Sequence, residues 1–308
     1  MDPEISVIIP TYYRNDLLPE AIESVVGQDY EPVELIVVDD SGEGHAEPVL
    51  SEYDNVVDKA IIKDQNGGWQ AAYTTGIEAS TGDYIQFLDD DDYFLEGKLT
   101  KTAAVLRENP EVGVSYCGAI RGNDGKFYPK PEVSGDILER ALRFQTFPLW
   151  TASMLMKREV LLDCLPLAGM GEDDDLDIEL GDTDLKIELA QRTKFDYVDE
   201  CLVFYRQGEN ELWTGKRKFR KILQNIRHQE ELYDRYPEVR EDLLAEWYER
   251  QGMNWLEDRP WSVRAIYCFM KATYHDRNSK IPKGLETMAS LFGRPGVVTA
   301  RRAHNMVK

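Results

Sequence analysis

Four consecutive aspartates follow a hydrophobic segment early in the chain. The segment ends at Leu88, and the carboxylates run from Asp89 to Asp92. Alternate residues that leave a strand point to the same side, so Asp89 and Asp91 can converge on one ligand. A hard cation such as Mg²⁺ or Mn²⁺ takes oxygen ligands, usually one or two carboxylates together with substrate phosphates. The pattern predicts a divalent metal site, and the alternative is a solvated acidic turn.

A second pair of carboxylates follows another apolar segment. Residues 35–38 are Leu-Ile-Val-Val, and this segment stops at Asp39 and Asp40. If both acidic runs leave the ends of neighbouring strands, like charges are crowded together at a cost in free energy. We therefore expect a positively charged group between the two acidic strand ends.

Strand and helix patterns alternate from the N-terminus to about residue 205. Apolar β-branched runs predict buried strands, and apolar residues at every third or fourth position predict helices. The expected strands are residues 5–9, 35–38, 57–62, 84–88, 112–117, 154–156 and 197–205, and the expected helices are residues 17–28, 68–79 and 182–191. This alternation indicates an α/β fold with a doubly wound, mainly parallel sheet, in which ligands bind beyond the carboxyl ends of the strands.

The chain changes character near residue 215. Long charged stretches with apolar residues at helical spacing predict a mainly helical appendage over residues 215–308, after an α/β domain over residues 1–214. The last stretch, residues 280–308, is basic and has interleaved apolar residues, namely Leu285, Met288, Leu291 and Phe292. It could lie on an anionic membrane surface, or it could be a helix docked on the acidic body of the protein.

The composition excludes one class of partner. With a net charge of −21 over 308 residues, most of the surface repels phosphates, so nucleic acid is not an expected partner. Such an acidic excess is also typical of adaptation to strong salt, which screens charge repulsion.

The cysteines and the apolar segments bear on the location of the protein. The four cysteines show no C-x-x-C pairing, so they suggest neither a zinc site nor a disulfide framework. No segment approaches the roughly 18 consecutive apolar residues of a membrane-spanning helix. Because the first residues also lack the basic start of a secretory signal, we expect a cytoplasmic protein.

The order of the segments resembles that of an inverting family-two glycosyltransferase with the GT-A fold. Residues 6–12 (SVIIPTY) are similar to the family's first strand and donor loop, and residues 37–41 (VVDDS) to its second. Residues 82–92 (GDYIQFLDDDD) resemble the strand that leads into its D-x-D motif, and the similarity covers roughly residues 4–206. The resemblance implies an enzyme that uses Mg²⁺ or Mn²⁺ to move a sugar, of the hexose class, from a nucleotide diphosphate to an acceptor hydroxyl. With the acidic composition, it suggests a salt-adapted archaeal source.

The resemblance implies a set of nucleotide-binding residues. Pro10 and Tyr12 would flank the nucleobase, and Asp40 would accept a hydrogen bond from it. A carboxylate at that place suits the imide N–H of uracil, which favours a UDP-sugar. The turn from Asn66 to Gly68 matches the family's N-x-G turn beside the donor.

The resemblance also assigns the acidic run. Asp89 and Asp91 would hold the ribose and the metal, with Asp91 as the expected direct ligand. One departure lies after the glycine turn, where many relatives have an Arg-Asn pair and this chain has Tyr73 and Thr74. The missing guanidinium leaves one fewer cation near the diphosphate, so the metal would carry more of that charge.

Two segments compete for the catalytic base. Residues 172–176 (EDDDL) and 181–185 (GDTDL) both resemble the family's E-D-x-D-L element, which leads through a helix and a strand to a Tyr-Arg pair. Counting back from Tyr205 and Arg206, Asp182 leaves room for one helix and one strand, whereas Asp173 leaves an unexplained insertion. Asp182 is therefore the predicted base and Asp173 the alternative, although Gly181 stands where the family usually has glutamate.

The acceptor is defined only by class. The resemblance suggests a role in glycoprotein or surface-glycan assembly, with a glycan or a lipid-linked glycan as the acceptor. The protein would act in the cytoplasm or at the cytoplasmic face of the cell membrane. In the second case, residues 280–308 would contact the membrane. Trp150 and Trp213 lie near the acceptor-side segments and could stack on a sugar. A non-catalytic nucleotide-sugar-binding or scaffold protein on the same fold is the alternative, because a fold alone does not decide function.

Overall fold

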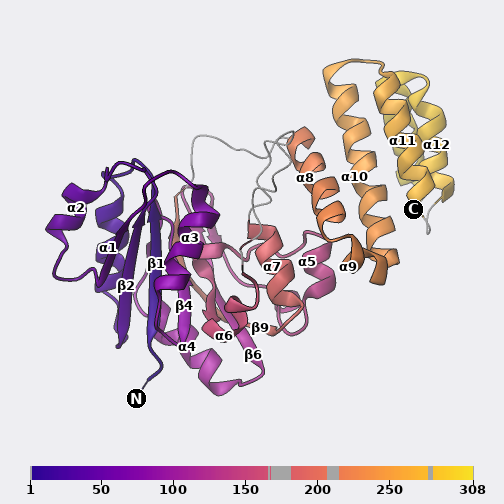
Figure 1. Cartoon of the computed structure of the whole chain (residues 1–308). Coiled ribbons are helices and arrows are strands. Elements are labelled where there is room, and N and C mark those ends of the chain that lie inside the picture. Colours follow the sequence, from indigo (N-terminus) through magenta and orange to yellow (C-terminus); the bar gives the residue numbers. More distant parts are fainter. Residues whose placement is uncertain (1, 166, 168–181, 207–214, 277–279, 308) are drawn as a thin grey trace. The chain divides into compact units, whose positions relative to one another are not determined.

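The computed structural model describes residues 2–165, 167, 182–206, 215–276 and 280–307; residues 215–221, 258, 280–283 and 303–307 are described by their backbone only. These residues fall into two compact units, which Figure 1 shows in indigo to magenta and in orange to yellow. The first unit holds the described residues up to Arg206, and the second holds those from Gly215 onward. The division of roles between the two regions stays a prediction.

One sheet runs through the first unit. Its strands are β1 (Ile5–Thr11), β2 (Val33–Asp39), β3 (Lys59–Ile62), β4 (Tyr84–Phe87), β5 (Tyr93–Phe94), β6 (Val112–Arg121), β7 (Gly125–Phe127), β8 (Leu155–Lys157) and β9 (Lys194–Tyr205). Within the described ranges they join in the order β3-β2-β1-β4-β8-β6-β9-β5, with β7 beside β6. The strands β3, β2, β1 and β4 are parallel to one another, as are β6 and β9, whereas β8 runs antiparallel between β4 and β6. The α/β architecture predicted from the alternating pattern is confirmed.

Helices connect the parallel strands. They are α1 (Leu18–Val26), α2 (Glu47–Glu52), α3 (Gly68–Ala79), α4 (Lys98–Glu108), α5 (Leu138–Leu142), α6 (Arg158–Leu162) and α7 (Asp182–Ala190), with 3₁₀ turns at Pro131–Val133 and Thr151–Ser153. Each predicted helix is present within a few residues of its expected ends. The short strands β5 and β7 and the helices α2, α4, α5 and α6 were not predicted, although Leu99, Thr102, Ala103 and Leu106 of α4 are buried at helical spacing.

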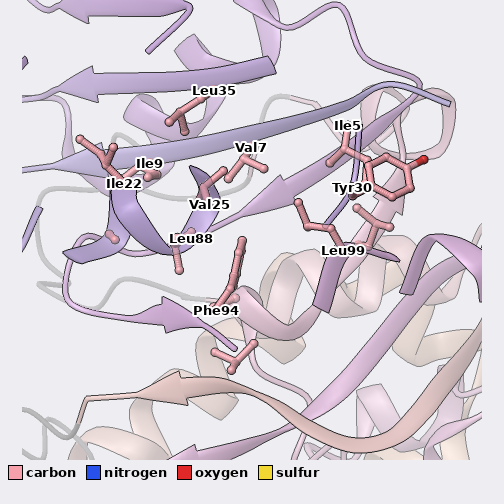
Figure 2. Packing of buried hydrophobic residues seen from close by; sticks show 14 of the residues in the cluster. Ile5, Val7, Ile9, Ile22, Val25, Tyr30, Leu35, Leu88, Phe94 and Leu99 are labelled. Atoms are coloured by element: carbon pink, nitrogen blue, oxygen red, sulfur yellow. The ribbon is translucent and has the colours of Figure 1, made fainter. Parts of the chain in front are cut away.

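The core of the first unit lies on the α1 side of the sheet. Ile5, Val7 and Ile9 alternate along β1 and pack with Ile22 and Val25 of α1, as Figure 2 shows. On α1 the buried positions recur every three or four residues, which gives one apolar side to a helix that lies on a sheet. The strands β1 and β2 are buried along nearly all of their length, which explains their continuous apolar sequences.

The helix α3 packs on the opposite face of β1. A Cβ built on Gly76 would lie 2.3 Å from Cγ2 of Ile8, so only glycine permits this close approach. Ile8 points away from the α1 side, because side chains alternate along a strand. Helices therefore cover both faces of the sheet at β1, and the loops at its carboxyl end remain available for a ligand.

The second unit is helical throughout its described residues. Its helices are α8 (Gly215–His228), α9 (Glu230–Arg235), α10 (Pro237–Asp258), α11 (Val263–His275), α12 (Lys280–Ser290) and α13 (Gly293–Val307). Leu256 of α10, Ala265 and Phe269 of α11 and Val297 of α13 form a small buried core. None of the described helices is both long and apolar enough to cross a lipid bilayer.

Candidate functional site

Three parallel strands bring the acidic segments to one edge of the sheet. β1 lies between β2 and β4, and Ile8 is in register with Ile36 on one side and with Phe87 on the other. Because the three strands run in the same direction, the loops that follow them begin at the same edge. The aspartates after β2 and β4 therefore lie on either side of the loop after β1, as their positions in the sequence predicted.

Arg14, in the loop after β1, joins two of the four aspartates. Its Nη1 lies 2.8 Å from Oδ1 of Asp90 and 2.8 Å from Oδ2 of Asp91. Asp90 also accepts a hydrogen bond from the backbone N–H of Tyr12. Burial raises the pKa of Asp90, and the charge of Arg14 offsets part of this increase. Sequence reasoning missed Arg14, although a basic residue two positions after Tyr12 in the donor loop was a usable signal.

Asp89 interacts with the residue that departs from the family pattern. The hydroxyl of Tyr73, a fully buried residue of α3, donates to Oδ1 of Asp89 over 2.8 Å. Burial raises the pKa of Asp89 to about 6; the hydrogen bond from Tyr73 works against this rise, and the charges of Asp91 and Asp90 add to it. Tyr73 thus supplies a neutral donor to the acidic run where many relatives carry a cation.

Asp92 is the most deeply buried member of the acidic run. It is 2% exposed, and its Oδ1 accepts a hydrogen bond of 2.8 Å from the backbone N–H of Arg206. Its Oδ2 finds no hydrogen-bond partner among the described residues. Burial, together with the charge of Asp89, raises the pKa of Asp92 well above its usual value. Arg206 also donates from Nε to the backbone oxygen of Asp91 over 3.0 Å, which fixes the turn.

Asp40 and Asp39, after β2, have different surroundings. Asp40 is 3% exposed, forms an ion pair with Lys63, and accepts a hydrogen bond of 3.0 Å from the backbone N–H of Gly67. Asp39 instead accepts hydrogen bonds from the backbone N–H groups of Ser41 and Ala46, so it stabilises its own loop. The positive charge expected between the acidic strand ends is present in the protein itself, because Lys63 pairs with the first end and Arg14 with the second.

The other predicted donor residues lie in the same loops. Pro10 is buried within β1, whereas the next aromatic residue, Tyr12, is half exposed and packs edge-on against Tyr13 with ring centroids 4.7 Å apart. Oδ1 of Asn66 accepts a hydrogen bond of 2.8 Å from the backbone N–H of Gly68, which closes the turn before α3. Since the backbone N–H of Gly67 in this turn also donates to Asp40, the turn lies beside the acidic end of β2.

Asp182 begins α7 and lies near the same acidic group. Its carboxylate accepts a hydrogen bond of 2.6 Å from Nζ of Lys186, one turn along the helix, and its side chain is 31% exposed. Burial raises the pKa of Tyr205 to about 12, and the charges of Asp92, Asp89, Asp91 and Asp182 contribute. The charges of the acidic run and of the predicted base thus both act on the hydroxyl of Tyr205. The alternative base, Asp173, lies outside the described residues.

One of the two candidate tryptophans lies beside the site. Trp150 stacks on Tyr205 with an interplanar angle of 25° and ring centroids 5.9 Å apart. It also meets Phe147 and Phe127 in edge-to-face contacts. Trp150 is partly buried by these rings and keeps some surface exposed, as a sugar-stacking residue requires. The other candidate, Trp213, falls outside the described residues.

The acidic run offers carboxylate oxygens, which are the ligands that a hard divalent ion prefers. Within the described ranges, no group of three or more His, Cys, Asp or Glu side chains forms a ready-made metal site. Asp91 is partly exposed, with 24% of its side chain accessible, and it offers carboxylate oxygens, one of which pairs with Arg14. Together with the unpartnered Oδ2 of Asp92, this donor set fits a hard ion that a protein carboxylate shares with substrate phosphates, rather than an all-protein cage.

Comparison with known families decides the assignment of the first unit. The profile described as glycosyl transferase family 2 matches residues 6–165, just over half of the chain. The chain belongs to glycosyltransferase family 2. The matched residues include all three loops at the acidic edge of the sheet.

Curated relatives match over shorter segments. An uncharacterized glycosyltransferase from Nostoc is 31% identical over 175 residues, which are 53% of this chain and 54% of the relative. The GalNAc(5)-diNAcBac-PP-undecaprenol β-1,3-glucosyltransferase of Campylobacter jejuni is 34% identical over 101 residues, 32% of this chain and 33% of the relative. This chain therefore spans about half, or less, of the length of these relatives. Both relatives are bacterial, so they do not support the expected source in a salt-adapted archaeon.

Solved structures show the fold. Staphylococcus aureus TarS 1–349 in complex with UDP-GlcNAc matches with a TM-score of 0.60 and 15% identity, over 99% of this chain and 92% of that chain. The mannosyltransferase PcManGT from Pyrobaculum calidifontis, in complex with GDP-Man and Mn²⁺, matches with a TM-score of 0.53 and 14% identity, over 99% of this chain and 81% of that chain. The similarity confirms the predicted GT-A type of fold, which is compatible with use of a divalent metal.

Proposed function

We propose that this chain transfers a sugar from a nucleotide diphosphate donor to an acceptor hydroxyl and inverts the configuration at the anomeric carbon. One observation carries the proposal. Tyr205 directly precedes Arg206, whose backbone N–H donates to Asp92 of the acidic run over 2.8 Å, and the charge of Asp182 at the start of α7 also contributes to the raised pKa of Tyr205. A donor held at the acidic run would therefore present its sugar near a second, separate carboxylate, which is the arrangement that a single displacement needs.

The donor nucleotide is proposed to bind across the three loops. Tyr12 is half exposed and can cover the nucleobase, with Pro10 beneath it in β1. Asp40 can accept the imide N–H of uracil, which favours a UDP-sugar. The contact requires Asp40 to share its carboxylate with Lys63 and with the turn that contains Gly67.

The diphosphate is proposed to lie beside Asp91 and Asp89. Asp91, which is partly exposed, would be the direct ligand of Mg²⁺ or Mn²⁺. Such an ion, when bound, offsets the negative charge that develops on the departing nucleotide diphosphate. Arg14 supplies a further positive charge at the same place, because it already pairs with Asp91 and Asp90. It can therefore replace the cation that is lost where Tyr73 and Thr74 stand.

Asp182 is proposed to act as the general base. Its carboxylate takes the proton of the acceptor hydroxyl while the acceptor oxygen bonds to the anomeric carbon, and the nucleotide diphosphate leaves with the electron pair of the broken C–O bond. Lys186 holds the carboxylate in place through its 2.6 Å hydrogen bond. Attack and departure on opposite faces of the sugar invert the configuration.

The acceptor is proposed to be a glycan, free or lipid-linked, in glycoprotein or surface-glycan assembly. The Campylobacter relative is named for transfer to an undecaprenol-linked glycan, which supports a lipid-linked acceptor. An acceptor of this kind would place the protein in the cytoplasm or on the cytoplasmic face of the cell membrane.

Nucleotide release from a panel of UDP- and GDP-sugars, with Mn²⁺ and with EDTA, tests the proposal. We expect release from one donor class, abolished by EDTA and by Asp91→Asn, with inversion visible in the NMR coupling constants of the product sugar. A non-catalytic nucleotide-sugar-binding protein would gain thermal stability from the same donors without releasing nucleotide. That outcome would overturn the proposed transfer reaction.

A further inference from the structure

The second unit exposes large apolar side chains to an unusual extent. Sixteen such side chains are exposed in the described part of the chain, and nine of them lie within residues 261–292. We call this group the apolar face of α11 and α12; its members are Val263, Tyr267, Met270 and Tyr274 of α11, Leu285 and Met288 of α12, and Trp261, Leu291 and Phe292 in the turns next to these helices. Phe292 and Tyr274 are 79% and 75% exposed. Soluble monomers seldom leave an apolar group of this size open to water, so its position calls for a partner.

The spacing of the exposed residues gives α11 two distinct sides. Val263, Tyr267, Met270 and Tyr274 are separated by four, three and four residues, so they lie along one side of the helix. The buried residues of α11, which include Phe269, form the opposite side and pack toward α10. Sequence reasoning missed this stripe, because it considered only residues 280–308.

The helix α12 has the same two-sided character. Leu285 and Met288 are exposed three residues apart, and Phe292, in the turn just after the helix, is exposed four residues further on. Glu286, on the other side of the helix, binds Arg301 of α13 over 3.0 Å. Arg301 of the basic stretch therefore forms an ion pair within the second unit, whereas the apolar side chains Leu285 and Met288 of α12 are exposed to solvent.

The two stripes are carried by neighbouring helices. Oγ1 of Thr273 in α11 lies 2.8 Å from Oγ1 of Thr287 in α12, and Nε1 of Trp261 donates to the backbone oxygen of Leu291 over 3.0 Å. Both contacts place α11 and α12 side by side, as Figure 1 also shows. Because α11 also packs onto α10 and α12 onto α13, each helix buries other sides and leaves its apolar stripe exposed.

The charge of this region is opposite to that of the rest of the chain. Residues 259–308 contain ten Lys and Arg against two acidic residues, a net charge of +8 in a protein whose total is −21. Nζ of Lys271 lies over the rings of Tyr267 and Tyr274, at 6.0 and 5.7 Å from their centroids, so one cation sits within the apolar face. Arg264 and Arg294 are exposed beside its residues.

We propose that the apolar face of α11 and α12 binds an anionic membrane surface. Its aromatic and aliphatic side chains would enter the headgroup region, and Lys271 and the neighbouring arginines would face lipid phosphates. Charge complementarity favours this partner over a second copy of the same face, because a symmetric dimer would bring two basic surfaces together. The inference stands apart from sugar transfer, since it concerns only the second unit.

Flotation with lipid vesicles tests the inference. We expect the protein to bind vesicles of phosphatidylcholine mixed with phosphatidylglycerol about tenfold or more better than vesicles of phosphatidylcholine alone. The double variant Met270→Glu/Phe292→Glu should lose this binding and keep its fold by circular dichroism, because both side chains are more than half exposed. Val26→Glu, which alters an apolar residue of the first unit that is 52% exposed, is the matched control and should bind as the unaltered protein does.

Two results would overturn the inference. The first is equal binding of the unaltered protein to anionic and neutral vesicles, or full binding by the double variant. The second is a dimer in analytical ultracentrifugation that the double variant converts to a monomer, with no vesicle binding, which would make the face a contact between copies. Neither result bears on nucleotide release, so the failure of this inference and that of the proposed reaction can be told apart.

Discussion

The hydroxyl of Tyr73 donates a hydrogen bond to Oδ1 of Asp89 over 2.8 Å, and this bond links α3 to the acidic run after β4. The family resemblance predicts an arginine at this position, so Tyr73 places a neutral hydrogen-bond donor beside the proposed donor site. The carboxylate of Asp89 consequently keeps a pKa of about 6, raised by burial and only partly lowered by Tyr73. The protonation state of this residue is therefore expected to change close to neutral pH.

Tyr73→Phe should shift the pH dependence of activity. Without the hydroxyl, the pKa of Asp89 rises further, because the bond from Tyr73 stabilises the ionised form. The acidic limb of the kcat/KM profile should then move to higher pH, and kcat/KM at neutral pH should fall about tenfold for the loss of one hydrogen bond to a charged group. Tyr53→Phe, which removes an exposed hydroxyl bonded to Glu23, is the control. An unshifted profile in Tyr73→Phe would contradict the role given to this bond.

Arg14→Ala should weaken binding of the nucleotide sugar. Arg14 neutralises Asp90 and Asp91 together, so its loss leaves two like charges where a diphosphate must bind. Calorimetry in the presence of Mn²⁺ should show an affinity for the donor lower by about tenfold or more. Arg14→Lys should restore only part of it, because the ammonium group of lysine is a more compact and more strongly hydrated charge than a guanidinium group.

A remote arginine provides the matched control for Arg14. Arg107 pairs with Asp2 at an exposed position, and surface ion pairs of this kind contribute little. Arg107→Ala should therefore bind the donor as the unaltered protein does. If Arg14→Ala also did so, the diphosphate would have to be bound elsewhere.

Asp182→Asn should separate catalysis from binding. We expect kcat to fall by about 10² to 10⁴, the usual contribution of a general base, while the donor dissociation constant stays the same. Glu188→Gln is the control, because Glu188 of α7 makes a similar ion pair with Arg192, four residues further on in the turn after the helix. Normal turnover by Asp182→Asn would point to another base, and Asp173→Asn would then be the next variant to measure.

Glu34→Gln should destabilise the first unit. Burial tends to raise the pKa of Glu34, but hydrogen bonds from Lys59, Ser6 and Thr81 outweigh burial and lower the pKa to about 2. Since the pKa in the folded state lies below the usual value of 4.5, this group stabilises the fold above that pH, and its contribution is lost as the pH falls toward 2. Urea denaturation at pH 7 should show a free energy of unfolding lower by about 2 kcal/mol.

The pH dependence gives the control for Glu34. The difference between Glu34→Gln and the unaltered protein should shrink as the pH is lowered from 5 toward 3, because the carboxyl of the unfolded chain then takes up a proton while that of the folded protein, with a pKa of about 2, stays ionised. Glu111→Gln removes an exposed ion pair with Lys194 and should change the free energy of unfolding by less than about 0.5 kcal/mol. A constant difference across this pH range would contradict the assignment to Glu34.

Much of the first unit could be read from its sequence. The continuous apolar runs of β1 and β2 are needed because both faces of these strands are covered, and the aspartates mark where the strands end. The helical period of α1 reflects its single buried side. Three separate motifs in the expected order then predicted the GT-A type of fold, which the comparisons confirm. This prediction was possible because the order of motifs along a chain can be seen without knowing how the chain packs.

The sequence by itself determined which segments are buried and where carboxylates leave the sheet, since periodicity and residue type act locally. Only the tertiary structure decided which charges meet, and it paired Arg14 with Asp90 and Asp91, Lys63 with Asp40, and Tyr73 with Asp89. The partners in these pairs are separated by 16 to 77 residues, and no local pattern encodes a contact that depends on how strands and helices pack. The apolar face of α11 and α12 likewise depends on tertiary packing. Whether an apolar residue of a helix is buried or exposed is decided by the side of the helix that neighbouring elements cover.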